Sequence, residues 1–106
     1  MYARRVSMNL KPNCAPELTK KLELQVIPLL RKQTGFHDEI TFVGQGEKKA
    51  FGISLWGTRE NAEAYNRDKY PEVTKILSGI VEGTPEVESF EVTNSTFHKI
   101  AAAVTV

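Results

Sequence analysis

The amino-acid sequence predicts an α+β fold whose elements follow one another in the order β-α-β-β-α-α-β. Three observations lead to this prediction. Apolar residues alternate with polar ones near the N-terminus, they then recur with a helical period, and two later alternating stretches are separated only by a short glycine-containing turn. The chain has 106 residues, a length typical of one domain. We therefore expect residues 1–106 to form a single domain.

The first half of the chain supplies a strand, a helix and the start of a hairpin. The alternation over residues 2–10 predicts a strand with one strongly apolar face. Residues 17–33 repeat apolar side chains at helical spacing, which predicts an amphipathic helix. Pro28 lacks a backbone N–H, so we expect it to kink this helix about one turn before the end. Gly35 is placed to cap the helix.

Two alternating stretches, residues 36–43 and 50–56, predict an antiparallel hairpin around a turn at residues 44–47. Three apolar residues are expected on one side of the first of these strands: Phe36, Ile40 and Phe42.

The second half of the chain predicts two helices and a last strand. Thr58 can cap the first helix, which carries Tyr65 and Tyr70. Pro71 disfavours helical backbone angles at the residue before it, which ends this helix. A shorter helix is predicted over residues 72–80. We expect the stretch Gly83-Thr84-Pro85 to end that helix. β-Branched and aromatic residues then predict a strand over residues 87–98.

This order of elements is the ferredoxin-like split β-α-β arrangement, which has helices on one side of a four-stranded antiparallel sheet. One layer of helices leaves the second sheet face open, and we expect a second copy of the chain to cover it. If the alternation holds, that face carries a small, mixed set of residues: Arg5, Ser7, Asn9, Gly52, Ser54 and Trp56.

Composition and charge exclude several classes of function. The 14 basic and 13 acidic residues give a net charge of +1, which disfavours a nucleic-acid-binding protein. One cysteine allows neither an intrachain disulfide nor a multi-cysteine metal site. No apolar stretch approaches the ~20 residues that span a membrane, and the N-terminus lacks the apolar core of a secretory signal. We expect a cytoplasmic protein without a membrane partner.

Three stretches of the sequence resemble the antibiotic biosynthesis monooxygenase-type domain of the dimeric α+β barrel superfamily. They are the end of the first helix with its Gly35-Phe36 step, the strand that ends in Trp56, and the pattern Ala62-x-x-Tyr65 in the helix that follows. The resemblance implies a homodimer whose two sheets face each other to form a barrel. It also implies a pocket between each sheet and its own helices.

The resemblance further implies a cofactor-independent monooxygenase that acts on a small aromatic or conjugated ligand, with no metal. Such an enzyme deprotonates an acidic phenol, and the resulting carbanion reacts with O₂. This reaction requires hydrogen-bond donors for the oxyanion in a pocket that excludes water. The candidate catalytic residues are Trp56, Asn61, Tyr65 and Tyr70. The candidate substrate-binding residues are Asn9 and His98.

Several of these residues also have a purely structural interpretation. Trp56 would anchor the sheet against a helix or a partner, which is the interpretation we favour. Tyr65 and Tyr70 lie five residues apart and would not share one helical face closely, so each would pack at an edge with a hydrated hydroxyl. The basic pair Arg4-Arg5 is balanced by acidic residues elsewhere and is expected on the solvated surface.

Two further functions stay open at this point. The chain has no strong acid–base constellation, which allows a non-catalytic, ligand-binding or stress-related homodimeric domain. A haem-degrading enzyme ranks last. The haem-degrading branch of the family has a Trp where this chain has Tyr65, and a His at about the position of Lys75. His37 and Glu39 could share a metal, but two ligands make a poor site.

Overall fold

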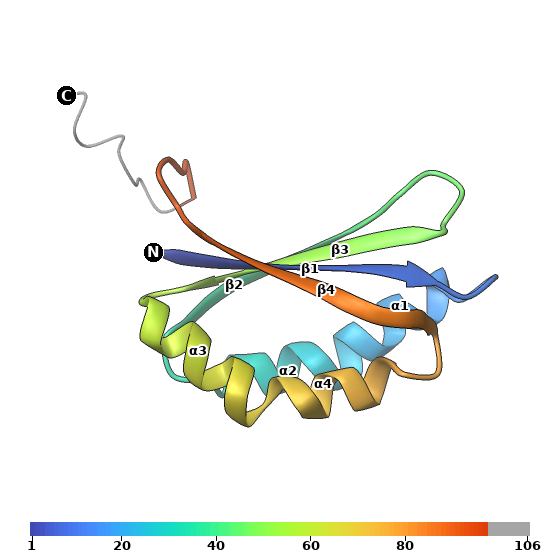
Figure 1. Cartoon of the computed structure of the whole chain (residues 1–106), viewed down its shortest axis with the longest axis horizontal. Helices are drawn as coiled ribbons and strands as arrows, with labels where there is room; N and C mark the ends of the chain where they lie inside the picture. Colours follow the sequence, from blue (N-terminus) through green and yellow to red (C-terminus); the bar gives the residue numbers. More distant parts are fainter. Residues whose placement is uncertain (98–106) are drawn as a thin grey trace.

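The computed structural model describes residues 1–97. It contains one antiparallel sheet in the strand order β2-β3-β1-β4, with all helices packed under the same face (Figure 1). The strands are β1 (Tyr2–Leu10), β2 (Phe36–Val43), β3 (Lys49–Trp56) and β4 (Val81–Glu91). The helices are α1 (Ala15–Lys21), the π-helical turn η1 (Leu22–Val26), α2 (Ile27–Arg31), α3 (Arg59–Asp68) and α4 (Tyr70–Leu77). The predicted α+β class and order of elements are confirmed.

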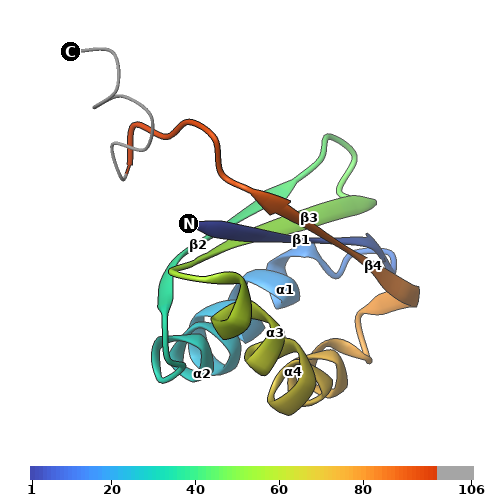
Figure 2. The same cartoon turned by 60° about the vertical axis from the view of Figure 1, so that its left-hand side comes forward.

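The first helical region accommodates Pro28 through a π-helical turn. The N–H of Ile27 donates to the carbonyl of Leu22, five residues earlier, and Pro28 then occupies the first turn of α2. A π-turn widens the helix locally and changes the hydrogen-bond ladder at the point where proline has no N–H to contribute. The run from α1 to α2 thus stays helical while it passes along the sheet (Figure 2).

The boundaries of the second helical region differ from the prediction. Thr58 caps α3 as expected, since its Oγ1 accepts a hydrogen bond of 3.1 Å from the N–H of Asn61. The helical path breaks at Lys69, whose φ is −126°, and Tyr70 begins α4 instead of extending α3. Pro71 lies in the first turn of α4, where its missing N–H costs little. The helix predicted over residues 72–80 therefore begins at Tyr70 and ends at Leu77.

The prediction of the last strand over residues 87–98 is wrong at both ends. β4 runs from Val81 to Glu91, and the stretch expected to end the preceding helix lies inside the strand. Gly83 has a φ of +71°, and the pairing of β1 with β4 shifts register between Ser7 and Asn9. The Gly-Thr-Pro stretch is therefore part of a bulge in an edge strand, a position that tolerates both glycine and proline.

The face predicted for β3 is also wrong. Arg4 pairs with Ser54 and Val6 pairs with Gly52, so these residues share the helix-covered side of the sheet. Trp56 is on that side too and is fully buried. The pattern of β3 alone allows either assignment, because one step along a strand exchanges the faces and only the register between strands decides.

A second shift of register affects β2. The pairing of β2 with β3 is irregular between Phe36 and Asp38, so a bulge at His37 separates two parts of the strand. Phe36 therefore faces Trp56, with the ring centroids 5.5 Å apart in an edge-to-face arrangement. The later residue Ile40 faces the opposite side, which corrects the expectation that Phe36 shares a side with Ile40 and Phe42.

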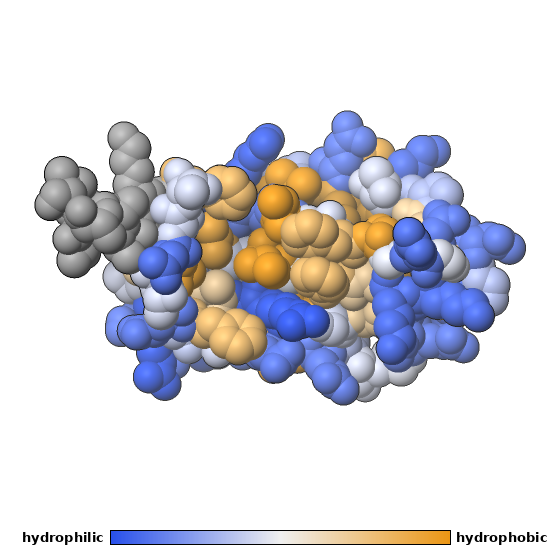
Figure 3. Space-filling view, turned by 90° about the horizontal axis from the view of Figure 1, so that it is seen from above, coloured by the Kyte–Doolittle hydropathy of each residue, from blue (hydrophilic) through white to orange (hydrophobic). Residues whose placement is uncertain are grey.

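These corrections make the uncovered side of the sheet apolar. We call this side the outer face, and its apolar residues are Ile40, Phe42, Phe51, Ile53, Leu55 and Phe90. Figure 3 shows this side, with apolar residues gathered at the centre and polar residues toward the rim. The opposite, helix-covered side is the inner face. Within residues 1–97 no helix is both long and apolar enough to cross a membrane.

Candidate functional site

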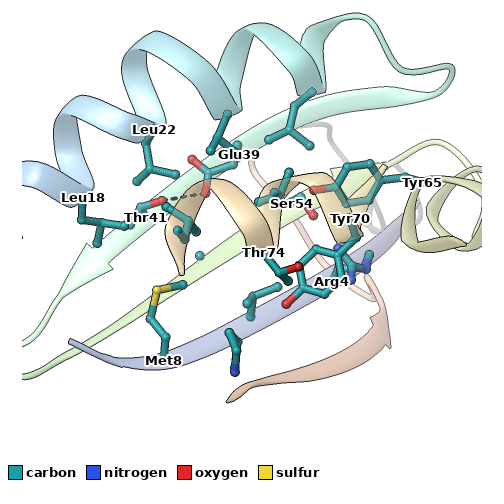
Figure 4. A pocket seen from close by; sticks show the side chains of 17 residues that line it. Arg4, Met8, Leu18, Leu22, Glu39, Thr41, Ser54, Tyr65, Tyr70 and Thr74 are labelled. Carbon is teal, nitrogen blue, oxygen red and sulfur yellow. Dashed lines mark hydrogen bonds between the residues drawn. The ribbon is translucent and has the colours of Figure 1, made fainter. Parts of the chain in front are cut away.

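A cavity of about 60 Å³ lies between the inner face and the helices (Figure 4). Its walls are mostly apolar side chains from the two helical regions: Leu18, Leu22, Val26, Leu30, Val73 and Leu77. Its polar groups come mainly from the strands and from the two tyrosines of α3 and α4. An apolar pocket with a few converging polar groups is the usual form of a small-molecule site.

A row of polar residues crosses the floor of this cavity. Glu39 of β2 pairs with Ser54 of β3, and Ser54 pairs with Arg4 of β1. Neighbouring strands lie about 4.8 Å apart, so the backbones of Glu39 and Arg4 are separated by about 10 Å. All three side chains line the cavity, and each is named in Figure 4. The sheet therefore holds a carboxyl group and a guanidinium group on either side of a serine.

Arg4 is a buried cation, with 3% of its surface exposed. Its Nη2 donates a 2.7 Å hydrogen bond to Oδ1 of Asn66. Its Cζ lies 4.6 Å from the ring centroid of Tyr70 and 5.0 Å from that of Tyr65. Burial lowers the pKa of Arg4, but a guanidinium keeps its proton in proteins. The expectation that Arg4 is solvated is therefore wrong, because β1 turns this residue toward the helices.

Tyr65 and Tyr70 both line the cavity beside Arg4. Their ring centroids are 6.2 Å apart, because the break at Lys69 places them on two different helices. Burial raises the pKa of Tyr65 to about 12 and also raises the pKa of Tyr70. Both side chains are therefore neutral phenols near pH 7, and their hydroxyl groups can donate hydrogen bonds to a ligand.

Glu39 brings a carboxyl group into the same cavity. Burial raises its pKa, although the 2.6 Å hydrogen bond donated by Thr41 Oγ1 to Oε2 works in the opposite direction. A Cβ placed on Gly52 would lie 2.8 Å from the same Oε2, so the glycine makes room for this carboxyl over β3. A carboxyl group of raised pKa in a cavity is a candidate general acid or base.

Trp56 lies behind this row and supports it. Its Nε1 donates a 2.9 Å hydrogen bond to Ser54 Oγ, and its ring stacks on Tyr65 with the centroids 4.9 Å apart. Trp56 thus contacts two residues of the cavity without lining it. Asn61 also lies outside the lining, near the start of α3, where its Oδ1 accepts a 2.8 Å hydrogen bond from Thr58 Oγ1.

Of the two predicted substrate-binding residues, Asn9 does not line this cavity. Asn9 is exposed near the end of β1, where its register partners are Lys49 and Glu82. His98 lies outside the described residues. The structure therefore gathers Tyr65 and Tyr70 at the cavity, keeps Trp56 directly behind them, and places Asn9 elsewhere.

The sequence prediction did not include Arg4, Glu39, Thr41 or Ser54. One signal was present in the alternation of β1, which places Arg4 on the same side as the apolar residues Val6 and Met8. A charge in an apolar row is unusual and marks a candidate site. Within residues 1–97, no group of three or more His, Cys, Asp or Glu side chains is arranged to hold a metal ion.

Comparisons with known proteins find similarity in structure. No family model matches the chain, and no curated protein matches it. The monooxygenase ActVA-Orf6 of Streptomyces coelicolor, solved with nanaomycin D, is 13% identical with a TM-score of 0.75, and the match covers 89% of this chain and 88% of that one. SnoaB, a cofactor-independent oxygenase from Streptomyces nogalater, is 11% identical with a TM-score of 0.71, over 90% and 95% of the two chains.

A protein of unknown function from Nitrosomonas europaea is similar to the same degree. It is 14% identical with a TM-score of 0.73, and the match covers 90% of this chain and 91% of that one. Structures described as putative antibiotic biosynthesis monooxygenases, from Bordetella bronchiseptica and Deinococcus radiodurans, match with TM-scores of 0.73 and 0.71 at 15% and 10% identity. These likenesses establish the architecture: the chain has the fold of the antibiotic biosynthesis monooxygenase-type proteins. The fold hosts proteins with and without a known activity, so function has to be argued from the cavity itself.

Proposed function

We propose that this chain is a cofactor-independent oxygenase-type enzyme that acts on a small aromatic or conjugated hydroxy compound in the inner-face cavity. One observation carries the proposal. A single, mostly apolar cavity combines the Glu39 carboxyl, whose pKa burial raises, with the neutral hydroxyl groups of Tyr65 and Tyr70. The oxygenases among the similar structures support the same class of reaction.

These groups supply the steps that such a reaction needs. The Glu39 carboxylate removes a proton from a CH₂ group that is conjugated with a carbonyl oxygen of the substrate. The negative charge moves to that oxygen, and the two tyrosine hydroxyls donate hydrogen bonds to the oxyanion that forms. The carbanion gives electrons to O₂, and a carbon–oxygen bond forms as a hydroperoxide after Glu39 returns the proton. Loss of the second carbon-bound proton and cleavage of the O–O bond release water. The CH₂ group and O₂ thus become a carbonyl group and H₂O.

The cavity has to widen before it accepts a ring. Its volume is about 60 Å³, whereas an engineered cavity that binds benzene measures about 150 Å³. The wall formed by Leu22 and Val26 belongs to the π-helical turn that precedes Pro28. Irregular turns of this kind are frequent at functional sites. We propose that this wall moves outward when a substrate enters.

We also propose that a second copy of the chain covers the outer face. Ile40, Phe42 and Phe90 are each more than two-fifths exposed there, and their side chains adjoin the partly exposed Ile53 and Leu55. A contiguous apolar patch at the centre of a sheet with a polar rim is typical of a protein interface (Figure 3). A copy of the same sheet offers matching apolar area with the same polar rim.

Oxygen uptake tests the proposed activity. We would supply anthrones, which carry such a CH₂ group, to the purified chain in an oxygen electrode and compare the wild type with Glu39→Gln. Loss of the base should lower kcat by about 100- to 10,000-fold. The matched control is Glu23→Gln, which removes an exposed carboxyl group from η1 and should retain the wild-type rate.

Two results would contradict the proposed activity. An unchanged rate in Glu39→Gln would remove the base from the mechanism. Binding of these compounds without any uptake of oxygen would favour the alternative, a ligand-binding domain without turnover.

A further inference from the structure

We propose that the inner-face cavity recognises a small conjugated carboxylate, and that Arg4 forms the ion pair with it. This inference specifies the substrate class of the proposed function and therefore rests on the same cavity. It does not depend on turnover, because it concerns only which charge the site binds.

Within residues 1–97, the contacts of Arg4 are with neutral groups. The guanidinium donates to the amide oxygen of Asn66 and lies against the faces of Tyr65 and Tyr70. Neither ring supplies a negative charge near pH 7, since burial raises the pKa of both phenols. Transferring a cation to an apolar surrounding is costly unless an anion accompanies it. These contacts leave a cation whose charge is not neutralised by the groups it touches.

The position of Arg4 directs this charge to the cavity. Its side chain lines the cavity together with Tyr70 and Thr74 (Figure 4). One amino group of the guanidinium is engaged by Asn66, and the guanidinium also interacts with the side chain of Tyr65. With five N–H donors, the planar group keeps others for a ligand. Two of these can form the parallel pair of hydrogen bonds that guanidinium groups make with carboxylates.

The other end of the row determines how such a ligand would lie. Glu39 would repel a second anion, so the carboxylate of the ligand belongs at the Arg4 end and its uncharged part near Glu39. The backbones of these two residues are about 10 Å apart, which suits a short conjugated molecule that spans Ser54. The carbon that Glu39 deprotonates would then be conjugated with, and distant from, the bound carboxylate.

Matched pairs of carboxylate and amide test this inference by NMR chemical-shift titration. Acetate against acetamide probes the Arg4 end with molecules near the size of the closed cavity, and benzoate against benzamide probes a ring. We expect each carboxylate to bind at least about tenfold more tightly than its amide. Arg4→Met should abolish this preference, whereas Arg67→Met, at an exposed arginine of α3, should keep it.

Several outcomes would overturn the inference. Equal affinity for acetate and acetamide would show that the site does not select charge, as would the absence of binding by either at about 100 mM. A preference that persists in Arg4→Met would place the anion elsewhere. If Arg4→Met fails to fold, the preference of the wild type for acetate over acetamide still tests the inference. Arg4→Lys, which keeps the charge, should then retain that preference.

The stability of Arg4→Met separates a binding role from a structural one. An apolar side chain at this position avoids the cost of burying a charge without an anionic partner. We therefore expect Arg4→Met to melt at or above the wild-type temperature while it loses the carboxylate preference. A large destabilisation together with unchanged anion binding would assign Arg4 to the scaffold alone.

The two proposals fail in different ways. Selective binding of carboxylates without oxygen uptake would retain this inference and remove the oxygenase activity. Oxygen uptake with neutral substrates and no selectivity for carboxylates would retain the oxygenase activity and remove this inference.

Discussion

Two neighbouring rows of residues cross the sheet, one on each face. On the inner face, Glu39, Ser54 and Arg4 lie side by side under the helices. The outer row consists of the adjacent residues on the same three strands. Ile40 pairs with Ile53, and Ile53 pairs with Arg5. Arg4 is 3% exposed and Ile40 is 43% exposed. The charged residue is buried and the apolar residue is accessible, which inverts the distribution expected for a single-chain fold.

The inversion has a different explanation on each face. Polar and charged groups are costly to bury, and a fold that needed only a core would place apolar residues under the helices. The proposed ligand would account for the inner row, because it would pair with the buried charge. The outer row exposes apolar area that becomes favourable when another surface covers it. The same alternation thus separates a candidate site from a candidate interface by one step along the strand.

The largest expected effect comes from placing a charge on the outer face. Leu55 lies on this face of β3 with Ala3 and Asp38 as its register partners. Leu55→Glu would therefore bury a carboxylate with no cation directly opposite it in the proposed dimer. We expect the dissociation constant to rise about 100- to 1,000-fold. Sedimentation equilibrium should then show one chain mass where the wild type shows two.

Leu24→Glu is the matched control, because Leu24 is 69% exposed on η1 and far from the outer face. It should leave the dimer intact. A wild-type chain that is monomeric at micromolar concentration would remove the interface altogether, and dissociation by both variants would show that any added charge has the effect.

A smaller effect is expected from adding one methyl group to the inner face. In Gly52→Ala the new Cβ would crowd Oε2 of Glu39, the end of a flexible side chain that can move aside. The fold should therefore tolerate the change, while displacement of the base lowers the oxygenase rate by about 10- to 100-fold.

Gly79→Ala is the matched control for this substitution. A Cβ at Gly79 meets no atom within 4 Å, so that variant should keep the wild-type rate. If Gly52→Ala is as active as the control, the position of the Glu39 carboxyl over β3 does not matter for the reaction.

The comparison of the two faces also shows which parts of the fold are predictable from sequence. Strands and helices were predicted in the right order because their periods are local properties of the chain. Which way a strand faces depends on register between strands, and here a bulge at His37 in β2 and another in β4, between the partners of Ser7 and Asn9, alter it. A bulge leaves no clear signal in an alternating pattern, so the sequence places Phe36 on the wrong side of β2. The pattern of β3 is regular, but it does not tell which side Trp56 takes until the register with β1 is known.

The candidate site was predictable only in part for the same reason. Tyr65 and Tyr70 were proposed from a family resemblance, and both line the cavity. Arg4 was interpreted as half of a solvated basic pair, although adjacent strand residues point to opposite sides and one of the two had to face the helices. Glu39 could be assigned only after the pairing of β2 with β3 was known.

The smallest predicted effect concerns the pH dependence of stability, and it distinguishes a buried carboxyl group from an exposed one. Burial raises the pKa of Glu39 in the folded chain above the value of about 4.3 that a glutamate has when unfolded. The folded state then binds the proton more tightly than the unfolded state, so ionised Glu39 lowers stability at pH 7. As the pH falls through the raised pKa this cost is recovered, and recovery is complete below the unfolded value.

Glu39→Gln should therefore melt at a higher temperature than the wild type at pH 7. The difference between the two should shrink as the pH is lowered and become constant below about pH 4. Thermal unfolding of both chains from pH 3 to pH 7 measures it, with Glu23→Gln as the control for removal of an exposed charge. A difference that is the same at every pH would mean that the folded and unfolded chains hold this proton equally well. The inner row would then be no more costly to maintain than a solvated one, and the contrast between the two faces would lose its energetic basis.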